Sequence, residues 1–179
     1  MEARSFWKCI TLILSALDLT LGCTWIQYRY DIVSRESLSL IREMGGELVH
    51  DGVIVPFPHK TYDDVFHSQM DDKIAFIRET TKQILKLYHG NLDAVTWDRQ
   101  KLTEFQIILH RQAVELRKCV QPRKRNRILI PYFKALNENV LKKKTYSAQA
   151  WEIIRAQVRI HLQRLNVLAA SIRKEMTSV

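Results

Sequence analysis

Glycine and proline are scarce in this chain. Its 179 residues include five glycines and four prolines, too few for the many tight turns of a β-sandwich or a β-barrel. Hydrophobic residues make up 46% of the chain, which excludes intrinsic disorder. Since the length is that of one compact domain, the composition favours a single helical domain.

Catalytic and metal-binding motifs are also missing. The six histidines are scattered, with no His-Glu-x-x-His motif and no two histidines four residues apart, and Cys-x-x-Cys is absent too. Neither a glycine-rich phosphate loop nor a Gly-x-Ser-x-Gly motif occurs. We expect His161 to be a hydrogen-bonded or half-exposed histidine, not a metal ligand. The sequence therefore predicts no catalytic residues, no metal and no cofactor, and argues against an enzyme.

Long hydrophobic runs are absent except near the N-terminus, where the short stretch CITLILSAL follows a weakly basic start. A run of this length is too short to span a bilayer and is typical of a secretory signal peptide. We expect residues 1–22 to be this signal peptide, leaving a secreted domain of residues 23–179 with no membrane insertion. An uncleaved helix near a membrane is the alternative, because Glu2 and Asp18 are unusual in a signal peptide.

Only three cysteines are present, and removal of the signal peptide leaves Cys23 and Cys119. In an oxidising compartment an even pair most simply forms one disulfide. Such a bond would close a long loop and stabilise the fold by roughly 4–5 kcal/mol. Two free thiols are the alternative.

Acidic residues are outnumbered, since 28 Lys and Arg oppose 19 Asp and Glu to give a net charge of +9. The basic residues cluster at 123–127 and 142–144. Weak binding to heparan sulfate is physically reasonable for such clusters, although a hydrated loop is the plainer interpretation. Nucleic-acid binding is not expected, because the aromatic residues fall mainly on stripes that should be buried.

Helical periodicity dominates the rest of the chain. Apolar residues recur at three- and four-residue steps over 26–44, 61–89, 97–119, 128–144 and 147–174, which predicts five helices around one core. The connection over 47–60 is long enough for a crossover, as in cytokine-type bundles. Ser147 is the expected N-cap of the last helix. The expected core anchors are four aromatic residues, Trp97, Phe105, Phe133 and Trp151.

Three segments resemble the type I interferons of bony fish. They are YFKALNENVLKKKTYSAQAWEIIRA (132–156), TWDRQKLTEFQIILHRQAVELRKCV (96–120) and SRESLSLIREM (34–44), the last followed by Phe57-Pro58. Together they span nearly the whole mature chain in the order of the family. Many mammalian members carry a cysteine where this chain has Gln149, so the two-cysteine arrangement resembles the fish proteins. The resemblance also implies the disulfide Cys23–Cys119.

The resemblance implies a five-helix up-up-down-down cytokine bundle with a long loop after the first helix. It further implies a secreted antiviral cytokine that brings together two different class II cytokine receptor chains and triggers JAK–STAT signalling. The high-affinity chain would contact Leu38, Ser39, Arg42, His50, Asp51, Arg155, Ala156 and Arg159. The second chain would contact Lys101, Gln106 and His110. Gly52 in the loop and Gln106 and His110 on the third helix differ from the mammalian pattern, so the chemistry of these contacts departs from it.

Arg155 and Arg159 are expected on the outward face of the last helix, opposite the Trp151 stripe. Arg155→Ala would then weaken high-affinity receptor binding by more than about 1 kcal/mol without changing the melting temperature. The rival hypothesis is a cationic host-defence protein that acts directly on microbial membranes or glycosaminoglycans. Salt separates the two hypotheses, because binding to polyanions weakens as ionic strength rises.

Overall fold

The computed structural model describes residues 24–46, 55–120 and 129–178, and within these ranges the chain is helical and has no strands. A short helical stretch, residues 24–28, precedes the first long helix. The elements that follow are α2 (Tyr30–Glu43), α3 (His59–Phe66), α4 (Met70–Tyr88), α5 (Arg99–Cys119), α6 (Ile130–Leu136), the π-helix η2 (Asn137–Lys142) and α7 (Ala148–Thr177). The predicted all-α class is confirmed.

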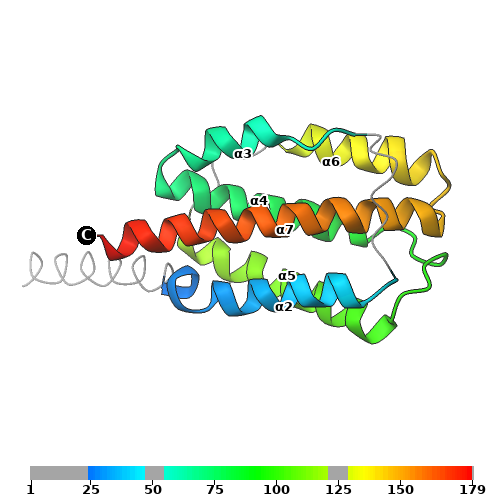
Figure 1. Cartoon of the computed structure of the whole chain (residues 1–179), viewed down its shortest axis with the longest axis horizontal. Coiled ribbons are helices and arrows are strands. Elements are labelled where there is room, and N and C mark those ends of the chain that lie inside the picture. The colour runs from blue at the N-terminus through cyan, green and yellow to red at the C-terminus, as the bar shows by residue number, and fades with distance from the viewer. Residues whose placement is uncertain (1–23, 47–54, 121–128, 179) are drawn as a thin grey trace, which may run out of the picture.

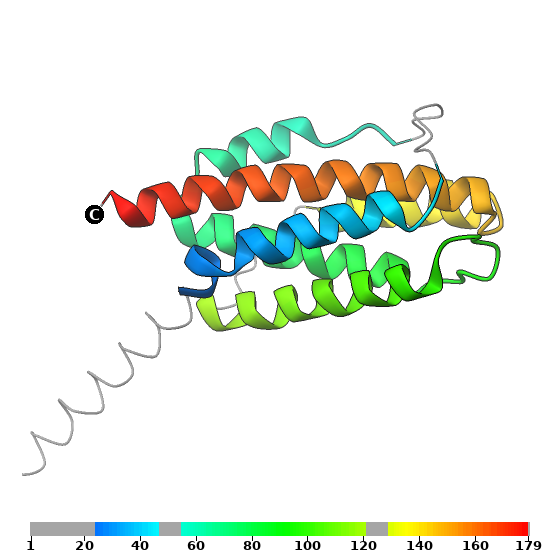
Figure 2. The same cartoon turned by 60° about the horizontal axis from the view of Figure 1, so that its bottom comes forward.

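Four long helices, α2, α4, α5 and α7, form a bundle (Figure 1). Helices α2 and α4 run in one direction and α5 and α7 in the other, as both views show (Figure 2). Helix α2 packs against α5 and α7, and α4 packs against the same two helices. Parallel helices therefore lie diagonally across the bundle, and α6 with η2 forms a fifth helix beside α4 and α7. This is the predicted up-up-down-down order, and it requires the long connection between α2 and α4.

The prediction of one helix over 61–89 is wrong, because the chain breaks between α3 and α4. The amide and the hydroxyl of Ser68 both donate to the carbonyl oxygen of Val65, at 3.0 and 2.7 Å, and so close the end of α3. Gln69 is extended, with ψ of 154°, and α4 begins at the next residue. Helix α3 is thus a separate part of the crossover, packed against α4 and α7.

The fourth predicted helix, 128–144, changes its hydrogen-bonding pattern partway along. Helix α6 passes at Asn137 into the wider turn of η2, where Val140 and Leu141 are both fully buried. Thr145 and Tyr146 follow with φ of 50° and 55°. This left-handed conformation is unusual for residues that carry a side chain, and above all for a β-branched or bulky one. The turn into α7 is therefore a strained one.

Side-chain caps define the starts of the third and last long helices. The Ser147 hydroxyl accepts a hydrogen bond from the amide of Ala150, so the predicted N-cap of α7 is confirmed. The Asp98 carboxylate accepts from the amide of Lys101 at 3.0 Å and caps α5 in the same way. Each cap satisfies an amide that the first turn of a helix leaves without a partner.

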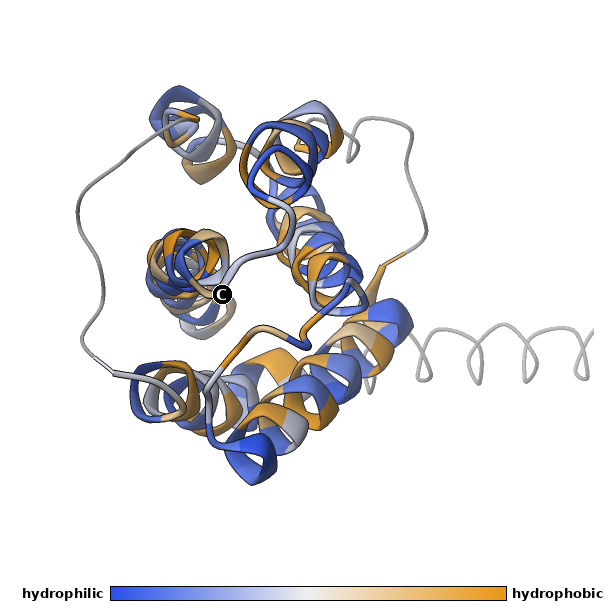
Figure 3. Ribbon diagram, turned by 90° about the vertical axis from the view of Figure 1, so that its right-hand side faces the viewer, coloured by the Kyte–Doolittle hydropathy of each residue, from blue (hydrophilic) through white to orange (hydrophobic). Residues whose placement is uncertain are grey.

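The core lies between the four long helices. Figure 3 looks along the bundle and shows that each helix carries both hydrophobic and hydrophilic residues. The four aromatic residues expected in the core, Trp97, Phe105, Phe133 and Trp151, are all buried. Tyr88 packs against three of them, with its ring centroid 5.2 Å from that of Phe105, 5.7 Å from that of Trp151 and 6.1 Å from that of Trp97.

Two predictions concern the N-terminal region. Cys119 is buried at the end of α5, whereas Cys23 lies outside the described residues, so the disulfide between them stays a prediction. The signal peptide over 1–22 lies outside them as well. Of the helices described, none combines the length and the apolar character that crossing a membrane requires.

Candidate functional site

The expected contact residues of α2 and α7 lie along the seam between these two helices. Asp31, Leu38 and Arg42 share one side of α2, and Asp31 lies 3.6 Å from Arg173 of α7, so this side of α2 is turned toward α7. Arg42 is exposed and Leu38 is half-buried.

Two expected residues of α7 lie on the other side of this seam. Ala156 and Arg159 are both half-buried, and they sit at the level of α2 where Arg155 meets the last residues of that helix. Leu38 and Arg42 of α2 and Ala156 and Arg159 of α7 therefore border the same seam, and we call these four residues the α2–α7 surface.

Other expected residues do not join this surface. Ser39 hydrogen-bonds to the Glu43 carboxylate, which also accepts from Lys101 of α5 at 3.3 Å. Ser39 is thus on the side of α2 that is turned toward α5. His50 and Asp51 lie outside the described residues.

The prediction that Arg155 lies on the outward face of the last helix is wrong, because its side chain has no exposed surface. Its guanidinium donates to the carbonyl oxygens of Ile41 (3.1 Å), Arg42 (3.3 Å) and Gly46 (2.5 Å). It also forms an ion pair of 2.7 Å with Glu152, one turn earlier on α7. A side chain in this position cannot touch a receptor unless the end of α2 opens, so Arg155 is withdrawn as a direct contact.

Arg155 instead satisfies the last carbonyl groups of α2, which have no partner within their own helix. Around it, the Glu152 carboxylate also accepts a hydrogen bond from Trp97 Nε1 at 2.5 Å, and the amide of Asp98 donates to the Met44 carbonyl at 2.7 Å. The end of α2, the residues just before α5 and the first turns of α7 therefore meet at one point. We call this cluster the Arg155 clasp: Gly45, Gly46, Trp97, Glu152 and Arg155.

The clasp fixes the place where the chain leaves α2. The segment that follows, 47–54, contains two of the residues expected to contact a receptor, His50 and Asp51. Burying a guanidinium is costly unless it is paired and fully hydrogen-bonded, as it is here. Arg155 therefore acts on the neighbouring surface by positioning backbone.

Gly45→Ala should destabilise the protein by about 1–3 kcal/mol, because a Cβ at this position has no room. It would lie 2.7 Å from Cδ1 and 2.9 Å from Nε1 of Trp97, and 3.0 Å from Cζ of Arg155. Both side chains are buried and held by hydrogen bonds, so neither can move away easily. The free energy of unfolding from urea titration measures the effect. The matched control is Gly46→Ala, whose Cβ would have nothing within 4 Å. Equal stability of both variants would contradict the tight packing at Gly45.

The expected contacts on α5 are not equivalent to one another. His110 is exposed, and Lys101 is partly occupied by its ion pair with Glu43. Gln106 donates to the carbonyl oxygen of Tyr88 at 2.9 Å and so joins α5 to the end of α4. Its side chain therefore has a structural role as well.

Two exposed apolar residues on the same helix were missed by sequence reasoning. Ile107 is 61% exposed and Val114 is 43% exposed, two helical turns apart and with His110 between them. The sequence could have indicated their exposure, because neither residue belongs to the apolar stripe formed by Leu102, Phe105 and Leu109. We call Ile107, His110 and Val114 the α5 surface.

His161 is fully buried in a cluster of aromatic rings that joins α7 to α3 and α6. Its Nδ1 lies 2.7 Å from the Tyr62 hydroxyl, and its ring centroid lies 4.6 Å from that of Phe57 and 5.0 Å from that of Phe133. Burial lowers the pKa of the His161 imidazole to about 3, so it is neutral at neutral pH. This agrees with the expectation of a hydrogen-bonded structural histidine.

Acid should destabilise the fold through His161. Between pH 6.5, the ordinary pKa of a histidine, and about pH 3, the unfolded chain binds a proton that the native chain does not. The free energy of unfolding should therefore fall by up to about 1.4 kcal/mol for each pH unit below 6.5. Thermal melts of His161→Gln across this range should show a shallower dependence on pH than the parent protein. Parallel curves would mean that His161 does not titrate differently on unfolding.

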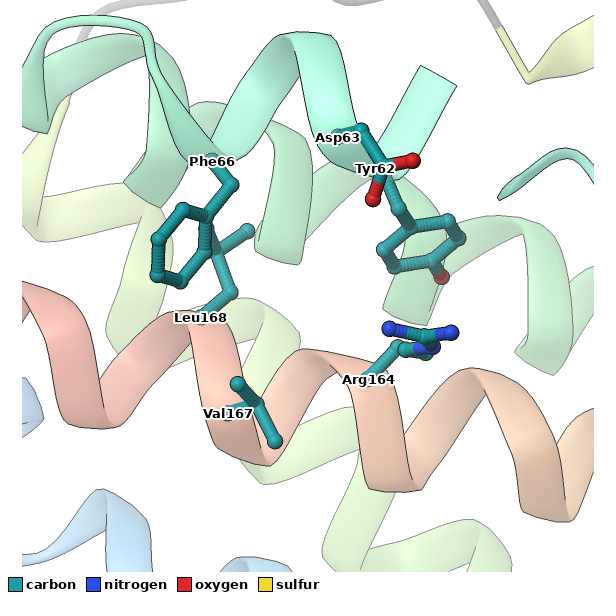
Figure 4. Close-up of a pocket in the computed structure, with 6 residues that line it drawn as sticks. All are labelled: Tyr62, Asp63, Phe66, Arg164, Val167 and Leu168. Carbon is teal, nitrogen blue, oxygen red and sulfur yellow. The ribbon is translucent and has the colours of Figure 1, made fainter. Parts of the chain in front are cut away.

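A pocket of about 270 Å³ lies between α3 and α7 (Figure 4). Phe66, Val167 and Leu168 form an apolar side, and Arg164 lies beneath the ring of Tyr62 on the polar side. It holds one carboxylate, Asp63, and no histidine. Throughout the described ranges, no three His, Cys, Asp or Glu side chains are grouped so as to hold a metal ion.

Comparison with known proteins supports one family. A family model described as Interferon alpha/beta domain matches residues 26–172. Interferon a3 of Oncorhynchus mykiss is 44% identical over 172 residues, which cover 95% of this chain and 98% of that protein. Interferon alpha-7 of Homo sapiens is 26% identical over 173 residues, which cover 87% of this chain and 90% of that protein. The solved structure of zebrafish interferon 1 matches with a TM-score of 0.76 and 35% identity, covering 84% of this chain and all of that one.

Proposed function

Because the chain belongs to the interferon alpha/beta family, we propose that it is secreted and signals by bringing together two different class II cytokine receptor chains. Members of this family are antiviral cytokines that bind cytokine receptors, so the protein is a cytokine and not an enzyme. The family match over residues 26–172 carries this conclusion, and the helical bundle shared with zebrafish interferon 1 agrees with it. JAK–STAT signalling is the expected consequence of receptor pairing.

The high-affinity receptor chain is assigned to the α2–α7 surface and to His50 and Asp51, which follow α2 in the sequence. Arg42 and Arg159 supply the charge on this surface, since Arg155 is enclosed in the clasp. Guanidinium groups are suited to carboxylates on a partner because they form two parallel hydrogen bonds. Ser39 is placed at the edge of the contact, on the side of α5.

The second receptor chain is assigned to the α5 surface, with Lys101 and Gln106 beside it. Exposed apolar side chains at the centre of an interface contribute most when they are fully covered by the partner. Ile107 and Val114 are apolar and exposed, so a partner can cover them, whereas Gln106 is already hydrogen-bonded within the bundle. They are therefore the preferred anchors.

Separate receptor-binding measurements test the two assignments. Arg42→Ala combined with Arg159→Ala should weaken the high-affinity chain about tenfold or more and leave the second chain unaffected. Ile107→Ser combined with Val114→Ser should do the reverse. Lys60→Ala with Lys174→Ala is the control, because both lysines are exposed on other parts of the chain. Unchanged affinity in either test variant would remove that surface from the proposal.

The function itself is tested in cells that carry an antiviral reporter and lack one receptor chain. Signalling should vanish when either chain is deleted and should persist at physiological salt. A direct host-defence action remains the second candidate, because the net charge is +9. Microbial killing that needs no receptor and disappears as salt is raised would favour that candidate.

A further inference from the structure

A second pocket lies between the end of α4 and α6 with η2, and none of its lining residues belongs to the α2–α7 surface or the α5 surface. It encloses about 420 Å³, within the range of small-molecule sites. Leu87, Ile130 and Phe133 form its apolar part, and Lys86 and Lys134 contribute cations from opposite sides. Gln83, Asn137 and Tyr146 add polar and aromatic groups. We call it the α4–α6 groove.

The two lysines of the groove differ from five others in the bundle. Each of those five forms an ion pair with a glutamate: Lys73, Lys82, Lys101, Lys118 and Lys142. Lys86 and Lys134 are exposed and have no such partner in the part of the chain that the structure describes. Among the described residues that line the groove, the one carboxylate is Glu138, which forms an ion pair of 2.8 Å with Lys142. The α4–α6 groove therefore presents uncompensated positive charge.

Unusual backbone borders the groove on one side. Asn137 and Glu138 open the π-helix, a form that is rare and often found at functional sites. Tyr146 has a left-handed φ of 55°, and its ring lies over Gly90, where a Cβ would come 3.5 Å from the Tyr146 Cε1. A bulky residue held in this conformation is strained, and such strain is retained where it positions a side chain.

We propose that the α4–α6 groove binds a segment of a sulfated polysaccharide of the heparan sulfate class. The sulfate groups would contact Lys86 and Lys134, and a sugar ring would lie against Tyr146. Hydroxyl groups of the sugar would hydrogen-bond with Gln83 and Asn137. A repeating anionic chain matches cations on two sides of one groove better than a single small ion does. No lining residue of the groove belongs to the proposed receptor surfaces, so a cytokine held on the polymer could still signal.

Binding to immobilised heparin tests this assignment with three charge-matched double variants. Lys86→Ser with Lys134→Ser should lower the affinity about tenfold and reduce its dependence on salt. Lys60→Ser with Lys174→Ser removes the same charge elsewhere and should have little effect. Arg123→Ser with Lys124→Ser tests the other basic cluster in the sequence. Equal losses in all three, or a loss confined to the last, would overturn the proposal, as would undiminished binding to desulfated heparin.

Tyr146→Asn gives an independent test of the aromatic contact. Asparagine tolerates a left-handed φ better than tyrosine, so the turn should persist while the ring is removed. Heparin affinity should fall while the melting temperature and receptor binding stay near those of the parent protein. Unchanged heparin affinity would remove the sugar contact from the proposal. In cells without heparan sulfate, the Lys86→Ser and Lys134→Ser variant should signal normally, which separates failure of this site from failure of receptor pairing.

Discussion

Arg155→Ala is expected to lower the free energy of unfolding by about 3–5 kcal/mol, among the largest losses for any single change in this protein. The substitution removes the donor for the carbonyl oxygens of Ile41, Arg42 and Gly46 and leaves Glu152 without its cation. Buried groups left without partners cost more than the hydrogen bonds themselves contribute. The end of α2 should therefore detach from α7 more readily.

Denaturant unfolding followed by circular dichroism measures this loss. Arg159→Ala is the matched control, because it is the same change one turn along α7 at a half-buried position, and it should cost about 1 kcal/mol or less. Arg155→Lys should be intermediate, since one ammonium cannot reach all the acceptors that the planar guanidinium reaches. An unfolding midpoint equal to that of the parent protein would show that Arg155 is not enclosed in solution.

The same variant should lose receptor affinity, but for an indirect reason. Arg155 positions the backbone at the end of α2, up to Gly46, so its removal should disturb the α2–α7 surface beside it. The sequence predicted weaker receptor binding at an unchanged melting temperature. The structure instead predicts that the melting temperature falls as well. Both quantities should fall together.

Trp151→Ala is expected to cost about 3–5 kcal/mol as well. The Trp151 ring is fully buried, 5.7 Å from the ring centroid of Tyr88 and 6.1 Å from that of Trp97. Its Nε1 donates to the carbonyl oxygen of Asn91 at 2.7 Å and ties α7 to the connection between α4 and α5. Alanine would leave a large cavity in the core and would remove the donor to the Asn91 carbonyl group.

The comparison of Trp151→Ala with Trp151→Phe separates these two contributions. Phenylalanine keeps much of the ring volume but cannot donate to Asn91, so it should cost about 1–3 kcal/mol. Urea unfolding monitored by circular dichroism gives both values. A normal midpoint for Trp151→Ala would place this residue outside the core.

Residue type misled the sequence interpretation of α7 at one position. Arg155 follows Trp151 by four residues and precedes Val158 by three, so its spacing places it beside the buried stripe. Its charge argued for an outward position, because an isolated buried charge is unfavourable. The charge is accommodated by carbonyl groups more than a hundred residues away, and no local pattern encodes that pairing. On α5 the error was in the other direction, because Ile107 and Val114 are apolar residues that are exposed.

The sequence by itself determined the all-α class, the N-cap at Ser147, the buried aromatic anchors and the family. These features depend on residues within a few positions of one another or on motifs that persist along the chain. Only the tertiary structure decided that Arg155 closes the end of α2, that His161 is neutral within aromatic rings, and that Lys86 and Lys134 line one groove. Each of these depends on groups from distant segments, whose partners and exposure are set when the helices pack.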